Sequence, residues 1–240
     1  MARYFIEVSY KGTNYSGFQV QKNANSVQAE VEKALFVFYK KQFELTGSSR
    51  TDAGVHALQN FFHFDSDMDI QDDSYNLNAI LPGDIVIKRI YRVADNAHCR
   101  FDAKSREYRY CIFDHKDPFL QDRAYYYPYP LKMELLQQAA VEILRQHDFT
   151  SFSKRNTQVR SFHCDILEST WLTENDCLVY QVKANRFLRG MVKGLVGTML
   201  LVGREKITLA DFLNIFQSKD CRLADFSVAS AGLFLNKVEY

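Results

Sequence analysis

The stretch GSSRTDAGVHALQNFFHF (residues 47–64) places one acidic residue, Asp52, on a small-residue turn just before a run that predicts a strand from Asn60 to Asp65. Ala53 and Gly54 are too small to shield the carboxylate, and Arg50 lies two residues upstream. An acid kept ionised by a cation within about 4–6 Å serves as a nucleophile or general base. A turn carboxylate that bonds only its own backbone is the more common explanation, so spacing alone leaves both readings open.

Outside this stretch, alternation and capping signals predict an α+β fold with largely antiparallel strands. Strands are expected at 3–8, 84–93, 107–113, 163–172 and 178–183, with a final strand ending at Tyr240. Helices are expected after the N-cap Ser26, at 133–145, at 186–202, and at 209–217, the last capped by Thr208 with Asp211 at N3. No glycine- or serine-rich linker separates the two halves of the chain.

The composition is that of a globular protein. The chain has 240 residues, 47% hydrophobic and 25% charged, which suits one large domain or two packed lobes. A formal charge of +1 means that any nucleic-acid partner must be bound by local basic patches. Five scattered cysteines, never spaced as CxxC, argue against a zinc site and a disulfide framework and fit a reducing cytosol. With no signal peptide and no membrane-spanning run, we expect a cytoplasmic protein.

A second candidate feature is KANRFLRGMVKGLVGTML (residues 183–200). Read as a helix, it puts Arg186, Arg189 and Lys193 on one face, with glycines at 190, 194 and 197 beside them. This is either a solvated basic face or a place where packed backbone or a polyanion approaches closely.

A third feature, between residues 100 and 110, interleaves basic and aromatic residues. Lys154, Arg155 and Arg160 form a separate basic patch. On the strand expected at 107–113, Tyr108 and Tyr110 point to one side and Arg109 to the other. Phosphate contacts combined with ring stacking are how single-stranded or flipped nucleotides are held. The third feature comprises Arg100, Phe101, Lys104, Arg106, Tyr108, Arg109 and Tyr110.

A metal site at Asp52, His56, His63 and Asp65 is also conceivable, but the spacing argues against it. The turn at Ala53–Gly54 prevents a helical i,i+4 pair, and the remaining histidines show no ligand spacing. We therefore expect no metal.

Several motifs together resemble the tRNA pseudouridine(38–40) synthases of the TruA type. RTDAGVHA (50–57) is similar to the family signature around its catalytic aspartate, and the other motifs follow in the family's order. They are YKGTNYSGFQVQ (10–21), SVQ (26–28), LNAILPGDI (77–85), HCRFDAKSREYRY (98–110), HDFTSF (147–152), KANRFLRGMVKGLVG (183–197) and GLFL (232–235). The chain departs from the family pattern at Phe18, usually tryptophan; at Lys193, usually arginine; and at Cys99, usually alanine.

The resemblance implies two similar lobes, 1–104 and 105–240, sharing a largely antiparallel mixed sheet with helices packed on it and an active cleft between them. It implies isomerisation of uridine to pseudouridine at positions 38, 39 and 40 of the tRNA anticodon stem-loop, by a homodimer that needs no cofactor. Asp52 would be catalytic and act on a flipped base. Tyr108 would stack on the uracil, Lys193 would pair with Asp52, Arg50 would anchor the loop or a phosphate, and Leu233 would form the pocket floor. Further tRNA contacts would come from Arg186, Arg189, Arg106, Lys154 and Arg155.

Three alternatives stay open at this point. The chemistry is the same in a pseudouridine synthase acting at another RNA site. A non-catalytic RNA-binding protein on the same scaffold would keep the basic patches without using Asp52. A metal-dependent hydrolase would use Asp52, His56 and His63.

Overall fold

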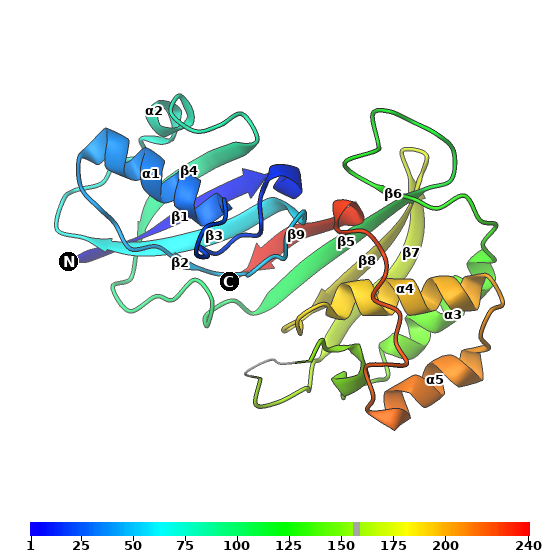
Figure 1. Ribbon diagram of the computed structural model, residues 1–240. Helices are drawn as coiled ribbons and strands as arrows, with labels where there is room; N and C mark the ends of the chain where they lie inside the picture. Colours follow the sequence, from blue (N-terminus) through cyan, green and yellow to red (C-terminus); the bar gives the residue numbers. More distant parts are fainter. Residues whose placement is uncertain (156–158) are drawn as a thin grey trace. The chain divides into compact units, whose positions relative to one another are not determined.

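A computed structural model describes residues 1–155 and 159–240, which form two compact units (Figure 1). The first unit comprises residues 1–104 and 234–240, and the second comprises residues 105–233. Almost all of the last strand, β9 (Leu233–Glu239), therefore belongs to the first unit, although the sequence analysis assigned 105–240 to one lobe. Both units combine helices with mainly antiparallel strands, so the predicted α+β class is confirmed.

The sheet of the first unit is built around the strand that follows Asp52. β3 (His56–Ser66) starts four residues earlier than predicted and pairs antiparallel with β1 (Ala2–Tyr10), which pairs antiparallel with β4 (Ile85–Val93). On its other side β3 pairs with β9 in parallel, through His56–Phe234 and Ala57–Leu235. The two-residue β2 (Thr46–Gly47) also pairs with β3.

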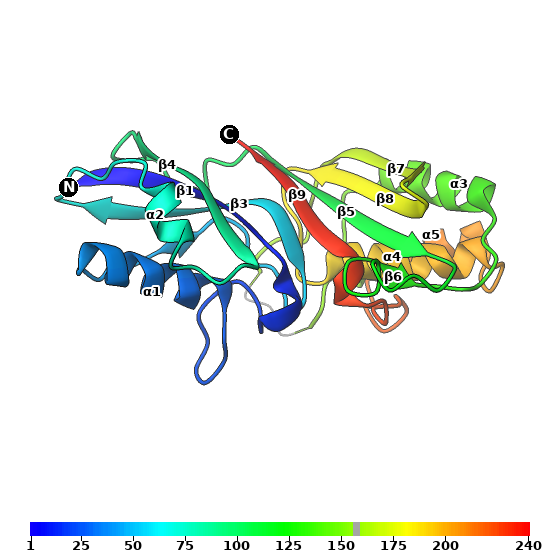
Figure 2. The same ribbon diagram turned by 90° about the horizontal axis from the view of Figure 1, so that it is seen from above.

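Helix α1 (Val27–Tyr39) lies along one face of these strands (Figure 2). It begins as predicted at Ser26, whose Oγ accepts the Ala29 N–H at 3.3 Å. The short helix α2 (Ser74–Asn78) is tied to it by Tyr39 Oη, which donates to Asp73 at 2.7 Å. Aromatic rings fill the core, among them Phe18, whose ring stacks on that of Phe62 at 4.4 Å between centroids.

In the second unit, β5 (Ser105–Phe113), β8 (Cys177–Ala184) and β7 (Ile166–Glu174) pair antiparallel in that order. The short β6 (Tyr125–Tyr126) runs parallel to the end of β5. β7 begins three residues after the predicted start at His163, because His163 pairs instead with Asp148 in an isolated bridge.

The helices of the second unit are α3 (Met133–Ile143), α4 (Met191–Gly203) and α5 (Leu209–Ser218). α5 confirms the predicted capping box: Thr208 Oγ1 accepts the Asp211 N–H at 3.1 Å, and the Asp211 carboxylate accepts the Thr208 N–H at 2.9 Å. Single-turn 3-10 helices lie at Gly12–Asn14, Thr150–Phe152 and Ser230–Gly232. None of the helices in the described residues has the length and the apolar sequence that spanning a membrane would require.

The helix predicted from Arg186 is wrong in its first turn. Gly190 has φ of 75°, a left-handed conformation that a right-handed helix cannot continue through, so α4 starts at Met191. Arg186 and Arg189 therefore precede the helix and do not share a helical face with Lys193.

The glycines within α4 serve packing inside the chain. A Cβ at Gly197 would lie 2.2 Å from the backbone oxygen of Asp225, and one at Gly194 would lie 2.7 Å from the Phe226 ring. Both glycines are buried, so the close approach they permit is that of packed chain and not of a polyanion.

Candidate active site

Asp52 lies where the sequence predicts it, on a tight turn. The Val55 N–H donates to the Asp52 carbonyl at 3.2 Å, and Gly54 has φ of 75°, which closes a β-turn over Asp52–Val55. A left-handed third residue is the position in such a turn that glycine fills without strain. Asp52 is half-buried and Ala53 is exposed, so the turn carries the carboxylate at the surface of the unit.

The backbone on both sides of Asp52 is fixed by the segment that follows β1. Phe18 N–H donates to the Thr51 carbonyl at 3.1 Å, and Gly54 N–H donates to the Tyr15 carbonyl at 3.3 Å. Gly12 reaches the same region closely, since a Cβ there would lie 2.0 Å from the Val55 oxygen. These contacts hold the turn against residues about 40 positions away in the chain, which limits how far Asp52 can move.

A buried polar network secures the segment that leads into the turn. Asn60 is fully buried; its Nδ2 donates to the Ser49 carbonyl at 2.9 Å and to Tyr10 Oη at 3.3 Å, while its Oδ1 accepts the Ser49 N–H at 3.3 Å. Tyr10 Oη in turn bonds Thr51 Oγ1 at 2.7 Å. Sequence reasoning missed this network. The sequence feature that could have indicated it is an asparagine on the same side of the strand as Phe62 and Phe64, which are buried. A polar residue on the core-facing side of a strand needs buried hydrogen-bond partners.

The Asp52 carboxylate has no hydrogen-bond or ion-pair partner among residues 1–104 and 234–240, its own unit. Arg50, the candidate cation for holding Asp52 ionised, is exposed and makes no ion pair within this unit. The chain between the two residues is tied inward at Thr51, whose hydroxyl bonds Tyr10 Oη at 2.7 Å. The Asp52 carboxylate also accepts no hydrogen bond from the backbone N–H groups of its own turn. It is therefore not a turn carboxylate that bonds only its own backbone, the alternative that spacing alone left open.

The histidines near Asp52 each have their own partners, so they do not gather around it as metal ligands. His56 Nδ1 accepts the Gly12 N–H at 3.0 Å, and its ring stacks on Phe234 at 4.6 Å. Asp65 pairs with Arg3 at 2.7 Å. His63 is buried beside Cys99, and burial lowers its pKa to about 4.

Tyr108 lies on β5 in the second unit, opposite Val182 of β8. It is 9% exposed, and its ring meets the edge of Phe187 at 4.9 Å between centroids. The predicted alternation along this strand is confirmed, since Tyr108, Tyr110 and Ile112 are all buried. Tyr110 is fixed in the core by its hydroxyl, which donates to the Ala229 carbonyl at 2.6 Å. Phe187, which precedes α4 in the stretch predicted as a helix from residue 186, is the ring next to Tyr108.

Lys193 lies in the first turn of α4 and is half-buried. Its Nζ donates to Ser230 Oγ at 3.4 Å, a contact that links α4 to the 3-10 turn just before Leu233. Leu233 is 7% exposed at the start of β9. Two of the predicted binding residues, Lys193 and Leu233, are thus connected by the Ser230–Gly232 turn, which Lys193 contacts and Leu233 follows.

Backbone and side-chain hydrogen bonds connect the segments that carry the predicted tRNA-contacting residues of the second unit. Lys154 N–H donates to the Arg189 carbonyl at 2.9 Å, which joins the patch at 154–155 to the segment before α4. Arg106 donates to the Asn185 carbonyl at 3.5 Å, next to Arg186.

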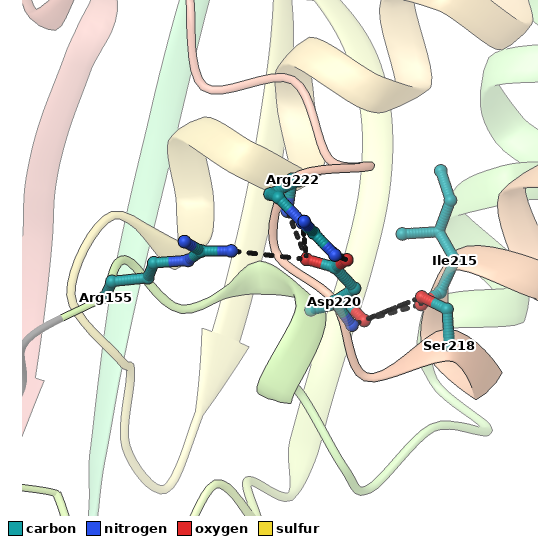
Figure 3. Close-up of polar contacts among 6 residues, drawn as sticks. Arg155, Ile215, Ser218, Asp220 and Arg222 are labelled. Carbon is teal, nitrogen blue, oxygen red and sulfur yellow. Dashed lines mark hydrogen bonds and ion pairs between the residues drawn. The ribbon is translucent and has the colours of Figure 1, made fainter.

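Arg155 is largely exposed, and its guanidinium lies 3.8 Å from the Asp220 carboxylate (Figure 3). Hydrogen bonds from Arg222 lower the pKa of Asp220 to about 2, so this acid is ionised at neutral pH and faces two guanidinium groups.

Comparison with known proteins gives one consistent result. The family model described as tRNA pseudouridine synthase matches residues 6–102 and 139–240. tRNA pseudouridine synthase A of Parabacteroides distasonis is 41% identical, covering 100% of this chain and 96% of its own length. The protein of the same name from Exiguobacterium sp. is 37% identical, and the match covers 100% of this chain and 98% of that protein. The one from a bovine strain of Staphylococcus aureus is 35% identical, and the match covers 98% of this chain and 90% of that protein. The resemblance read from the motifs is confirmed, and the chain belongs to the tRNA pseudouridine synthase family.

Proposed function

We propose that this protein isomerises uridine to pseudouridine in tRNA, at positions 38, 39 and 40 of the anticodon stem-loop. The observation that carries the proposal is the Asp52 carboxylate. It sits on a turn whose backbone is fixed from both sides, and it has no partner within its own unit. A carboxylate that no local donor occupies keeps its lone pairs for a substrate.

The reaction breaks the C1′–N1 bond of the target uridine and forms a C1′–C5 bond, and the hydrogen on C5 is lost as N1 gains one. Three steps are open to Asp52: attack on C1′, attack on C6, and removal of the C2′ proton. Each of the three requires the ionised carboxylate. Because the product is an isomer of the substrate, the reaction needs no redox partner and no energy source.

The target base must leave its stack before an acid can reach the sugar. We assign Tyr108 to stack on the extruded uracil, with Phe187 supporting its ring at 4.9 Å. We assign Lys193 as the cation that pairs with Asp52 in the complex with tRNA, and Leu233 as an apolar wall of the base pocket. Lysine offers a point charge in place of the planar fork of arginine, so this pair has a single contact.

Six basic residues are assigned to the tRNA backbone. Arg50 is exposed and makes no ion pair within its unit, which suits it to a phosphate next to the target nucleotide. The other five belong to the second unit: Arg106, Lys154, Arg155, Arg186 and Arg189. We expect tRNA affinity to fall steeply as salt concentration rises.

A net charge of +1 is low for one chain that binds tRNA alone. We propose a cytoplasmic homodimer in which the basic residues of two copies contact one tRNA.

The test is to map pseudouridine in tRNA from cells with and without the gene for this protein. We expect modification at positions 38, 39 and 40 to disappear in its absence and to return with the wild-type gene but not with an Asp52→Asn version. Unchanged modification at all three positions would refute the proposal. Loss at a different RNA position instead would keep the chemistry and overturn the assigned target.

A further inference from the structure

Two imidazoles and one thiol meet in the first unit, away from the Asp52 turn. They belong to His63 on β3 and to the adjacent His98 and Cys99, and one ligand atom from each lies within 4.8 Å of the other two. His63 Nδ1 and Cys99 Sγ are 3.1 Å apart, and the rings of His63 and His98 meet at 4.6 Å between centroids. We infer that His63, His98 and Cys99 form a binding site for one borderline-soft divalent cation of the zinc type.

The spacing of the three groups is close to what such an ion requires. Zn–S and Zn–N bonds of about 2.3 and 2.0 Å in a tetrahedron separate sulfur from nitrogen by about 3.5 Å, so the Nδ1–Sγ pair needs to open by only a few tenths of an ångström. His63 and Cys99 are buried, whereas His98 is half-buried, which leaves an entry path for the ion on the His98 side. Three protein ligands leave a fourth position for water.

The chemistry of the donor set selects the ion. Imidazole nitrogen and thiolate sulfur are preferred by zinc over magnesium or calcium, which prefer oxygen. On binding, the Cys99 thiol gives its proton to solvent and its hydrogen bond to the Thr46 carbonyl, now 3.2 Å from Sγ, is lost. The nearby cation Arg3 is already neutralised by two 2.7 Å bonds to Asp65, so it does not strongly repel a second positive charge.

The site is not fully preformed. The N–H groups of Arg100 and Phe101 donate to His98 Nδ1 at 3.1 and 3.4 Å and hold this ring in the absence of metal. His98 must exchange these bonds for the ion, so we expect weaker binding than at closed structural sites with four protein ligands. A bound ion would cross-link β3 to the segment at 98–101, 35 residues further along the chain.

The experiment titrates Co²⁺ into the purified, reduced, metal-free full-length protein and records the absorption spectrum. We expect one equivalent to produce a sulfur-to-cobalt charge-transfer band and tetrahedral d–d bands, and Zn²⁺ to displace both. Cys99→Ala should abolish the charge-transfer band. The matched control Cys221→Ala removes a more exposed thiol of the second unit and should leave the spectrum unchanged.

A second variant guards against failure of Cys99→Ala to fold. His98→Gln changes a half-buried side chain, and it should retain the wild-type unfolding transition without metal while binding Co²⁺ at least about 100-fold more weakly. No stoichiometric charge-transfer band in the wild type, or an undiminished affinity in His98→Gln, overturns the inference. The readout is metal binding itself, so the result is independent of the proposed isomerase activity.

Discussion

Asn60 offers a direct test of whether the polar network, and not merely the stability of the unit, positions Asp52. Replacing Asn60 by alanine removes the hydrogen bonds that its side chain makes to the buried Ser49 N–H and carbonyl. Each such loss at a buried backbone group costs about 1–3 kcal/mol, so Asn60→Ala should lower the free energy of unfolding by about 3–4 kcal/mol. The segment entering the Asp52 turn also loses its anchor, and a misplacement of about 1 Å at a reacting group reduces the rate by about 100-fold.

Asn78 provides the matched control within the same unit. Its side chain donates to the Ile87 carbonyl and accepts the Ile87 N–H, both at 2.8 Å, so Asn78→Ala removes the same two kinds of bond from another buried residue. We expect a loss of stability here too, because Ile87 loses two backbone hydrogen bonds, but no loss of activity per folded molecule, because Ile87 lies on β4 and not in the Asp52 turn.

The assay is tritium release from tRNA labelled at uracil C5, since the C1′–C5 bond displaces the hydrogen there. Urea denaturation supplies the folded fraction by which each rate is divided. We expect about 100-fold slower turnover for Asn60→Ala and wild-type turnover for Asn78→Ala. Equal rates in the two variants, whether both slow or both normal, would refute a specific positioning role for Asn60.

Two further predictions concern the second unit. Burial would raise the pKa of Asp148, but hydrogen bonds from Thr150 and the charge of Lys219 lower it to about 2, below its ordinary value of 3.8. The ionised Asp148 thus stabilises the fold at pH 7 and ceases to do so as the pH falls from about 4 to 2. Asp148→Asn should therefore lower the free energy of unfolding by about 1–2 kcal/mol at pH 7 and by progressively less below pH 4. Urea denaturation at each pH measures this difference, and a difference that stays constant with pH would contradict the prediction. Thr208→Ala should lower the free energy of unfolding by about 1 kcal/mol through loss of the α5 cap, whereas Thr208→Ser should not. Thermal denaturation can measure both, and equal losses in the two variants would exclude the cap as the cause.

The elements that could be read from the sequence are those whose signal is local. Ser26 and Thr208 are caps whose side chains reach backbone only three residues away, and both were located correctly. The turn at Asp52 was found for the same reason, since Ala53 and Gly54 define it by themselves.

Errors arose where a single backbone angle or a distant contact decides the outcome. The helical period continues through Gly190, so only its φ of 75° shows that α4 begins at Met191. Proximity along the chain suggested Arg50 as the cation beside Asp52, whereas Arg50 is exposed and makes no ion pair within its unit. The cluster of His63, His98 and Cys99 depends on the path of the segment after β4, which no ligand spacing encodes.

The central claim is that the Asp52 carboxylate performs the isomerisation, and single-turnover kinetics of Asp52→Asn tests it most directly. The control variant Asp69→Asn removes an exposed carboxylate of the same unit that accepts a hydrogen bond from Gln71. We predict that Asp52→Asn forms pseudouridine at least about 10⁴-fold more slowly than wild type while its affinity for tRNA changes by less than about threefold, and that Asp69→Asn behaves as wild type. Product formation by Asp52→Asn at the wild-type rate would contradict the account.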